Sequence, residues 1–167
     1  LLQRPRCWYY RNHQFDCLKK GGSQCFAVEG ENRSHAIFGG GPCHIVHPSN
    51  LAPALYVCEG SVELIGGERS TLPITRLFHG PDRGSVLSEH NLEPGEIITG
   101  IRFRPAPTSG FYAIKEKQSF DWPLVFACVA LEMDGRRIGT ARVCAGAVAP
   151  TPWPLPQVEL ALRGVDV

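Results

Sequence analysis

Four of the seven cysteines lie within the first 43 residues, and their arrangement constrains the fold more than any other feature of the chain. Cys7, Cys17, Cys25 and Cys43 are separated by nine, seven and seventeen residues, in a polar stretch without a helix or strand period. A loop this long is uncommon inside a compact domain unless it is tied down or has a function. Four thiols in such a loop suggest that a metal centre ties it down.

Three kinds of crosslink are compatible with these thiols. Disulfides would leave at least one of the seven cysteines unpaired, and the other three lie in apolar runs typical of buried thiols in a reducing compartment: Cys58, Cys128 and Cys144. Structural zinc usually shows closely spaced cysteine pairs, which are absent, although His44 and His47 lie nearby. An iron-sulfur cluster needs four thiolates and tolerates wide spacing when a loop wraps around it. The spacing alone leaves all three open.

Length and charge narrow the function classes. With 167 residues the chain forms one ordinary domain or two small ones. Its 17 Lys and Arg nearly balance its 16 Asp and Glu, which argues against nucleic acid or an anionic membrane as the main partner. No apolar run reaches the roughly 18 residues of a membrane span, and the first residues lack the apolar core of a signal peptide. We expect a cytoplasmic protein, or a periplasmic one if it is exported with a partner subunit.

The remainder of the chain predicts an α+β fold in which helices are segregated from antiparallel strands. Ser49 is a plausible N-cap for a short helix that ends near Cys58. A helical turn over 73–78 and a helix from residue 158 are also expected. Proline and glycine in 105–110 mark an internal boundary, and the last three predicted strands would form an antiparallel meander. Patterning predicts strands over 61–65, 68–72, 96–104, 111–118, 124–133 and 138–148.

Several motifs together resemble a known family. These are NRSHAIFGGGPCHIVHPSNLAPAL, GERSTLP, EIITGIRF, FYAIKEKQSFDWPLV and GAVAPTPW, in this order. They are similar to the flavin-binding subunit of the xanthine dehydrogenase family of molybdenum hydroxylases. More narrowly, the chain resembles the subgroup of bacterial aldehyde oxidoreductases and 4-hydroxybenzoyl-CoA reductase, whose flavin subunit has an extra loop with a 4Fe-4S cluster. The resemblance implies that Cys7, Cys17, Cys25 and Cys43 bind such a cluster.

The resemblance also implies a division of the chain. Residues 1–48 would form the cysteine-rich iron-sulfur loop, 49–107 the C-terminal part of a PCMH-type FAD-binding domain, and 108–167 an incomplete CO dehydrogenase flavoprotein C-terminal domain, a three-stranded antiparallel sheet with a helix. The chain reads as part of a larger protein. The family's glycine-rich loops, which hold the FAD pyrophosphate through backbone donors, would lie before Leu1. We therefore expect this chain alone to bind flavin poorly.

Three residues match family positions near the flavin. Asn50 stands where the family has aspartate, so a contact there would be a neutral hydrogen bond, or the residue simply begins a helix. Ile98 matches a position that touches the isoalloxazine, and strand packing explains it equally well. Lys115 matches a lysine whose charge would favour reduced flavin; alternatively it is a solvated lysine paired with Glu116 or Asp121.

No residue pattern supports substrate chemistry in this chain. There is no nucleophile with its base, no close acid and base pair, and no phosphate loop. The resemblance implies an electron-transfer subunit that contains FAD and a 4Fe-4S cluster. Its partners would be a molybdopterin-binding large subunit, where substrate is oxidised, and a 2Fe-2S small subunit. Electrons would leave through the FAD to an external acceptor. The alternative is a zinc-stapled or metal-free protein-interaction module.

Overall fold

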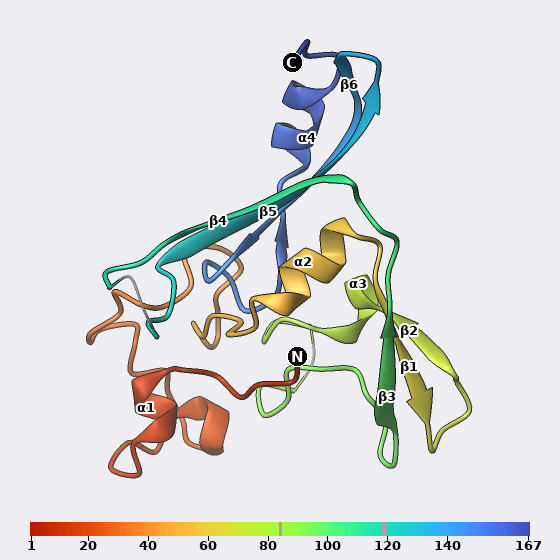
Figure 1. Ribbon diagram of the computed structural model, residues 1–167. Coiled ribbons are helices and arrows are strands. Elements are labelled where there is room, and N and C mark those ends of the chain that lie inside the picture. The colour runs from red at the N-terminus through yellow and green to blue at the C-terminus, as the bar shows by residue number, and fades with distance from the viewer. Residues whose placement is uncertain (84, 118–119) are drawn as a thin grey trace.

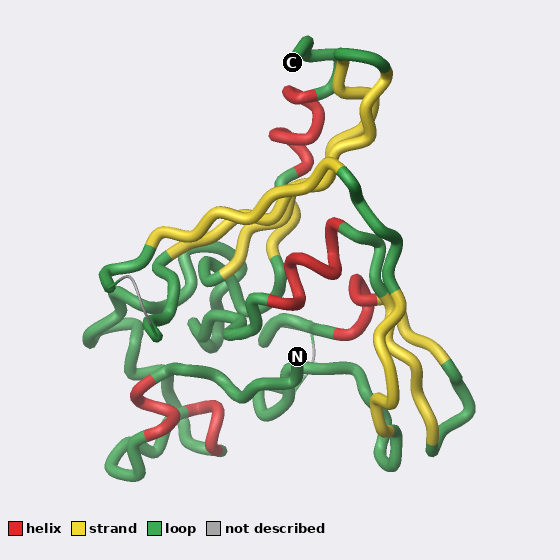
Figure 2. Tube along the Cα trace, viewed as in Figure 1, coloured by secondary structure: helices red, strands yellow, loops and turns green. Residues whose placement is uncertain are grey.

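The N-terminal quarter of the chain is mostly irregular. The computed structural model describes residues 1–83, 85–117 and 120–167. Up to residue 50 the chain contains two single-turn helices, α1 (Trp8–Arg11) and η1 (Leu18–Lys20), and otherwise loops and turns (Figure 2). The predicted absence of long regular elements in this cysteine segment is therefore correct, and the two short helices are additions to it.

A three-stranded antiparallel sheet follows, in the order β2-β1-β3. Its strands are β1 (Ser61–Ile65), β2 (Thr71–Pro73) and β3 (Ile97–Arg102). The predicted hairpin over 61–72 is confirmed, because Glu63 pairs with Thr71. The second strand begins later than predicted, and β3 ends two residues before the predicted Arg104. The outward exposure of Ile65 and Ile97 shows that the far end of this sheet contributes little to the core.

The C-terminal sheet has four antiparallel strands in the order β4-β5-β6-β7. They are β4 (Thr108–Ile114), β5 (Val125–Asp134), β6 (Arg137–Gly146) and β7 (Trp153–Pro154). The predicted meander is confirmed, with a tight turn at Gly135 in the left-handed region, which glycine adopts without strain. The prediction of three strands was wrong, because Trp153 pairs with Ala145 and adds a short edge strand. The predicted strand over 111–118 begins earlier and ends at Ile114, and Gln118 lies outside the described residues.

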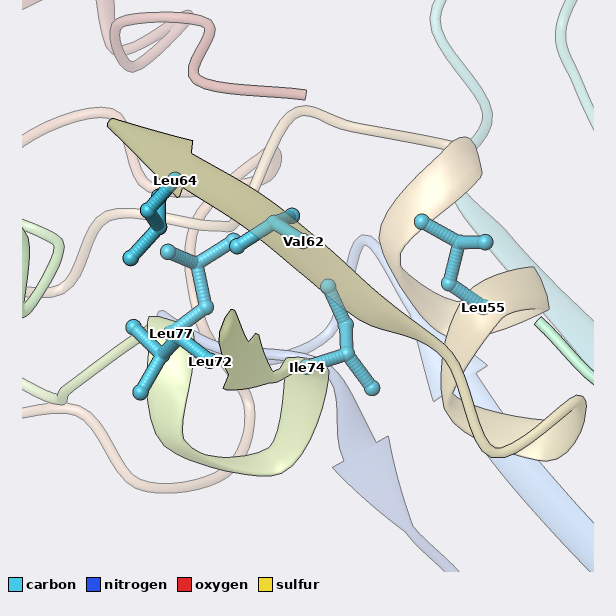
Figure 3. Close-up of a cluster of buried hydrophobic side chains, with 6 residues drawn as sticks. All are labelled: Leu55, Val62, Leu64, Leu72, Ile74 and Leu77. Atoms are coloured by element: carbon cyan, nitrogen blue, oxygen red, sulfur yellow. The ribbon is translucent and has the colours of Figure 1, made fainter. Parts of the chain in front are cut away.

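Helix α2 (Leu51–Val57) lies between the two sheets in Figure 1 and joins their cores. The Ser49 hydroxyl accepts a hydrogen bond from the Ala52 N–H at 3.1 Å, as expected of a cap. Leu55 points from α2 into the first core, which the sheet and helix α3 (Ile74–Leu77) complete (Figure 3). The buried side chains of this core are Leu55, Val62, Leu64, Leu72, Ile74 and Leu77.

The second core lies between α2 and the C-terminal sheet. Val57 packs there with buried residues from β5 and β6 and from the turn after β6, namely Phe126, Cys128, Ala130, Cys144 and Ala147. Cys128 and Cys144 are thus core residues, as predicted, whereas Cys58 is half-buried and packs at the edge of this core. Helix α4 (Pro156–Leu162) packs beside β6, near the start of that strand (Figure 1). The α+β class with antiparallel sheets is confirmed.

Candidate functional site

All four N-terminal cysteines line one small cavity. Cys7 precedes α1, Cys17 precedes η1, Cys25 lies in the following turn, and Cys43 lies eighteen residues further along the chain. The cavity measures about 10 Å³, which is room for about one water molecule. Its other walls are apolar or aromatic except for one lysine, and they comprise Tyr9, Tyr10, Leu18, Lys19, Phe26 and Ile45.

Backbone hydrogen bonds fold the segment around this cavity. The Cys17 carbonyl accepts from the N–H of Lys20 at 2.8 Å and of Gly22 at 3.0 Å, and Leu18 donates to the Gln24 carbonyl at 2.8 Å. Gly21, with φ 95°, closes the turn in a conformation that glycine adopts readily. A cluster of stacked and edge-to-face aromatic rings then supports the outer wall: Trp8, Tyr9, Phe15 and Phe26.

Burial raises the pKa of two of the four thiols, those of Cys7 and Cys43. Cys17 and Cys43 are 6% and 5% exposed, while Cys7 and Cys25 are half-buried. Burial raises the pKa of Cys43 to about 11 and also raises the pKa of Cys7. Metal ligation requires thiolates, so binding at this cavity would release protons and would strengthen as pH rises.

Two polar residues at the cavity were not identified from the sequence. The His35 Nε2 lies 3.2 Å from the Cys7 sulfur, and burial lowers the pKa of this histidine, which favours the neutral ring. When the sulfur is a thiolate, the ring nitrogen must be the donor. Lys19 contributes to the cavity wall and is almost fully buried. Lys19 lies outside the motifs described above, and His35 lies within one of them but was given no role, because the contacts of both residues depend on the tertiary fold.

The spacing of the thiols differs from that of a site for a single ion. Among residues 1–83, 85–117 and 120–167, no three His, Cys, Asp or Glu side chains are close enough to hold one metal ion. Tetrahedral zinc with Zn–S bonds of about 2.3 Å would bring its sulfurs to about 3.8 Å from one another. The seven cysteines are free thiols. Of the two nearby histidines, His47 packs edge-on against Phe78, with ring centroids 4.3 Å apart.

Four cysteine thiols are a donor set that a cluster of several irons and a single ion can both use. Each thiolate of a four-iron cluster binds a different iron, so the sulfurs spread around the cluster instead of meeting at one point. The four cysteines line the cavity together with apolar and aromatic neighbours and Lys19. The free volume of about 10 Å³ is smaller than such a cluster.

The three residues assigned to flavin do not meet in one pocket. Asn50 is exposed just before α2, and Ile98 in β3 packs against the first core beside Leu64. Lys115 is exposed after β4, whose end lies on the opposite side of the molecule from the start of β3 (Figure 1). Its expected partner Glu116 pairs with Arg33 instead.

A larger cleft of about 810 Å³ lies between the segment after α3 and the turn before α4. It is lined by aromatic and cationic side chains, including Tyr56, Arg69, Arg76, Phe78 and Trp153. This lining is chemically suited to a flat ring and to phosphate groups. None of the three residues that the sequence assigned to flavin lines this cleft. The cleft had no sequence signal, because its walls come from segments separated by some 70 residues.

Comparison with known proteins identifies the C-terminal part first. Residues 110–167 match the family model of the CO dehydrogenase flavoprotein C-terminal domain. The match covers the antiparallel sheet from β4 onward together with α4. This part of the chain is thus a domain of the kind found in CO dehydrogenase flavoproteins.

Whole-chain comparison extends the relationship. The chain is 35% identical over 159 residues to the aldehyde oxidoreductase FAD-binding subunit PaoB of Escherichia coli K12, covering 92% of this chain and 48% of that protein. It is 33% identical over 108 residues to the carbon monoxide dehydrogenase medium chain of Afipia carboxidovorans, covering 63% and 36%. Its structure matches reconstituted CO dehydrogenase from Oligotropha carboxidovorans with a TM-score of 0.56 and 25% identity, covering 70% and 40%.

The chain is therefore similar in sequence to the FAD-binding subunit of aldehyde oxidoreductase and to the CO dehydrogenase medium chain. These proteins are oxidoreductase subunits. The chain spans about half the length of the first of these relatives and less of the second. Within the described residues, each helix is too short to cross a membrane.

Proposed function

We propose that this chain is an electron-transfer subunit of a molybdenum hydroxylase, or a part of one, and that it carries a 4Fe-4S cluster next to an FAD site. Cys7, Cys17, Cys25 and Cys43 would be the cluster ligands. The observation that carries the proposal is their convergence on one small cavity with mostly apolar and aromatic walls, although they are up to 36 positions apart in sequence. Burial and sulfur ligation together are what such a cluster needs in order to be stable and redox-active.

Homology supports the flavin half of the proposal. The first relative is named as an FAD-binding subunit, and the matched C-terminal domain is named for a flavoprotein. FAD supplies hydride and single-electron chemistry when bound. In this chain Asn50, Ile98 and Lys115 would contribute a hydrogen bond, an apolar contact and a cation to the flavin. Because they are dispersed, we propose that further protein surface is required to complete the site.

The electron route and the partners follow from the same resemblance. Substrate would be oxidised on a molybdopterin-binding large subunit, and a 2Fe-2S small subunit would pass electrons on to this chain. The chain itself would hold the centres apart from water and from substrate, and electrons would leave to an external acceptor. A cytoplasmic location stays a prediction. The zinc-stapled interaction module is less favoured, since the thiols are not spaced for one ion within the described residues. The metal-free module is less favoured because the similar proteins are named as subunits of oxidoreductases.

The experiment that tests this proposal is anaerobic purification of the chain with iron and acid-labile sulfide analysis. We expect close to four irons and four sulfides per chain, with broad visible absorbance that bleaches on reduction. Cys17→Ser should abolish the absorbance, because it removes a buried ligand. The matched control is Cys58→Ser, which changes a half-buried cysteine outside the cavity and should leave it intact.

Each contrary outcome has a clear meaning. A colourless protein that contains one zinc per chain, released by a chelator, would replace the cluster with the structural module. Loss of colour in Cys58→Ser together with retention in Cys17→Ser would refute the ligand assignment.

A further inference from the structure

Lys19 is the one charged side chain in the wall of the cysteine cavity. Its side chain is 2% exposed, which is exceptional for lysine, since burial of an ammonium is costly unless it is paired. Its Nζ lies 2.7 Å from Glu89 Oε1 and donates to the Val86 carbonyl at 2.7 Å. These partners are about 70 residues away in sequence and fix the ammonium beside the cavity.

The charge of this group reaches the thiols. Lys19 and all four cysteines line the same cavity, and Glu89 and the Val86 carbonyl hold the ammonium in a wall of mostly apolar and aromatic side chains. Glu89 does not cancel this effect fully, because Arg4 also pairs with the same carboxylate at 3.0 Å. Two cations thus share one anion.

We propose that Lys19 is a positioning residue that sets the reduction potential of the centre bound by the four cysteines. The inference rests on the proposed function. Reduction adds one electron to the bound cluster, and a fixed cation in a poorly hydrated wall stabilises the added negative charge. Lys19 therefore raises the midpoint potential, and Glu89 lowers it. The alternative is that Lys19 has a purely structural role and only links the cysteine segment to the loop over 85–90.

The chain offers a matched set of variants. Lys19→Met removes the charge and keeps an unbranched chain, and Lys19→Arg keeps the charge with a different shape. Glu89→Gln removes the opposing charge. The control is Lys20→Met, because Lys20 is exposed and donates only to the Asn12 carbonyl at 2.8 Å. Arg4 still pairs with Glu89 in Lys19→Met, so that carboxylate keeps a partner.

The measurement is an anaerobic redox titration of the full 167-residue chain, followed by visible absorbance and electron paramagnetic resonance. We expect the midpoint potential to fall in Lys19→Met by a roughly tenfold change in the reduction equilibrium, about 59 mV for one electron. It should rise in Glu89→Gln and stay near the wild-type value in Lys19→Arg and Lys20→Met. Thermal unfolding is recorded for each variant, so a change in stability is seen separately.

Midpoint potentials that fall in Lys19→Met and rise in Glu89→Gln would support the inference. A loss of packing alone would not shift the potential in opposite directions according to the charge removed. Equal potentials in Lys19→Met and wild type, or shifts of the same sign in Lys19→Met and Glu89→Gln, would overturn it and leave the proposed function standing. If Lys19→Met does not fold, Glu89→Gln and Lys19→Arg still test the inference. Only a charge effect raises the midpoint potential in Glu89→Gln and leaves it unchanged in Lys19→Arg. Wild-type protein without iron would instead refute the proposed function, and the inference with it.

Discussion

Leu77 offers the sharpest test of how the two cores are joined. Its side chain is fully buried in the first core, against Val62 and Leu64 from β1 (Figure 3). Leu→Ala at such sites costs about 3 kcal/mol or more, since the apolar transfer energy is lost and a cavity remains. For a chain of this size, about 3 kcal/mol lowers the melting temperature by roughly 6–12 °C.

The three tryptophans make the assay informative, because Trp8, Trp122 and Trp153 all lie outside the first core. Helix α2 links both cores through Leu55 and Val57, so we expect one cooperative transition. Leu77→Ala should lower the melting temperature equally by far-ultraviolet circular dichroism and by tryptophan fluorescence.

The matched control is Leu160→Ala on α4, whose side chain is 71% exposed and whose change should cost less than about 0.5 kcal/mol. A fluorescence transition that stays at the wild-type temperature in Leu77→Ala would show that the cores unfold independently. Equal effects of Leu77→Ala and Leu160→Ala would refute the assigned core itself.

Two further predictions follow from charged groups and from the flavin assignment. The Arg69 guanidinium binds both oxygens of the buried Glu96 at 2.6 Å and lowers the pKa of this carboxyl. The pair therefore stabilises the fold above the ordinary glutamate pKa of about 4.3. This stabilisation is lost as the pH falls through the lowered pKa. We expect Arg69→Met to lower the urea midpoint at pH 7 and to differ less from wild type at pH 3, with exposed Arg102→Met as control; a pH-independent difference would contradict this. Isothermal titration of the chain with FAD should show no tight stoichiometric binding, because Asn50, Ile98 and Lys115 are dispersed, and saturation at one equivalent in the micromolar range would refute that reasoning.

Local signals carried most of the fold prediction. The Ser49 cap, the hairpin of β1 and β2 and the turn at Gly135 depend on neighbouring residues, so patterning was enough to find them. Strand β7 was missed because its two residues, in a proline-rich turn, become a strand only by pairing with β6. The half-buried state of Cys58 was also missed, because its position at the edge of a core is set by tertiary packing and not by neighbouring residues.

The candidate site was predictable only in its donor atoms. Four thiols in a polar loop predicted a shared site, and the structure brings these thiols to one cavity. Lys19 and His35 had no such signal: the ion pair of Lys19 spans 70 residues, and His35 reaches Cys7 across 28. Sequence patterns describe which groups are present, whereas the electrostatic surroundings of those groups depend on long-range contacts that only the folded chain supplies.

Those long-range contacts make the cysteine segment part of the whole fold. Lys19 binds Glu89, the Arg6 guanidinium donates to the Pro123 carbonyl at 3.0 Å, and Ile37 and His47 donate to Val148 and Ala149 at 2.8 Å. A group that binds the folded cysteines and not the unfolded chain stabilises everything that unfolds with them. Because the segment contacts loops from both halves, binding energy from any group held by the four sulfurs would be shared with both sheets. Conversely, the sheets hold the segment in place before any ligand binds, which lowers the entropy cost of assembling the site.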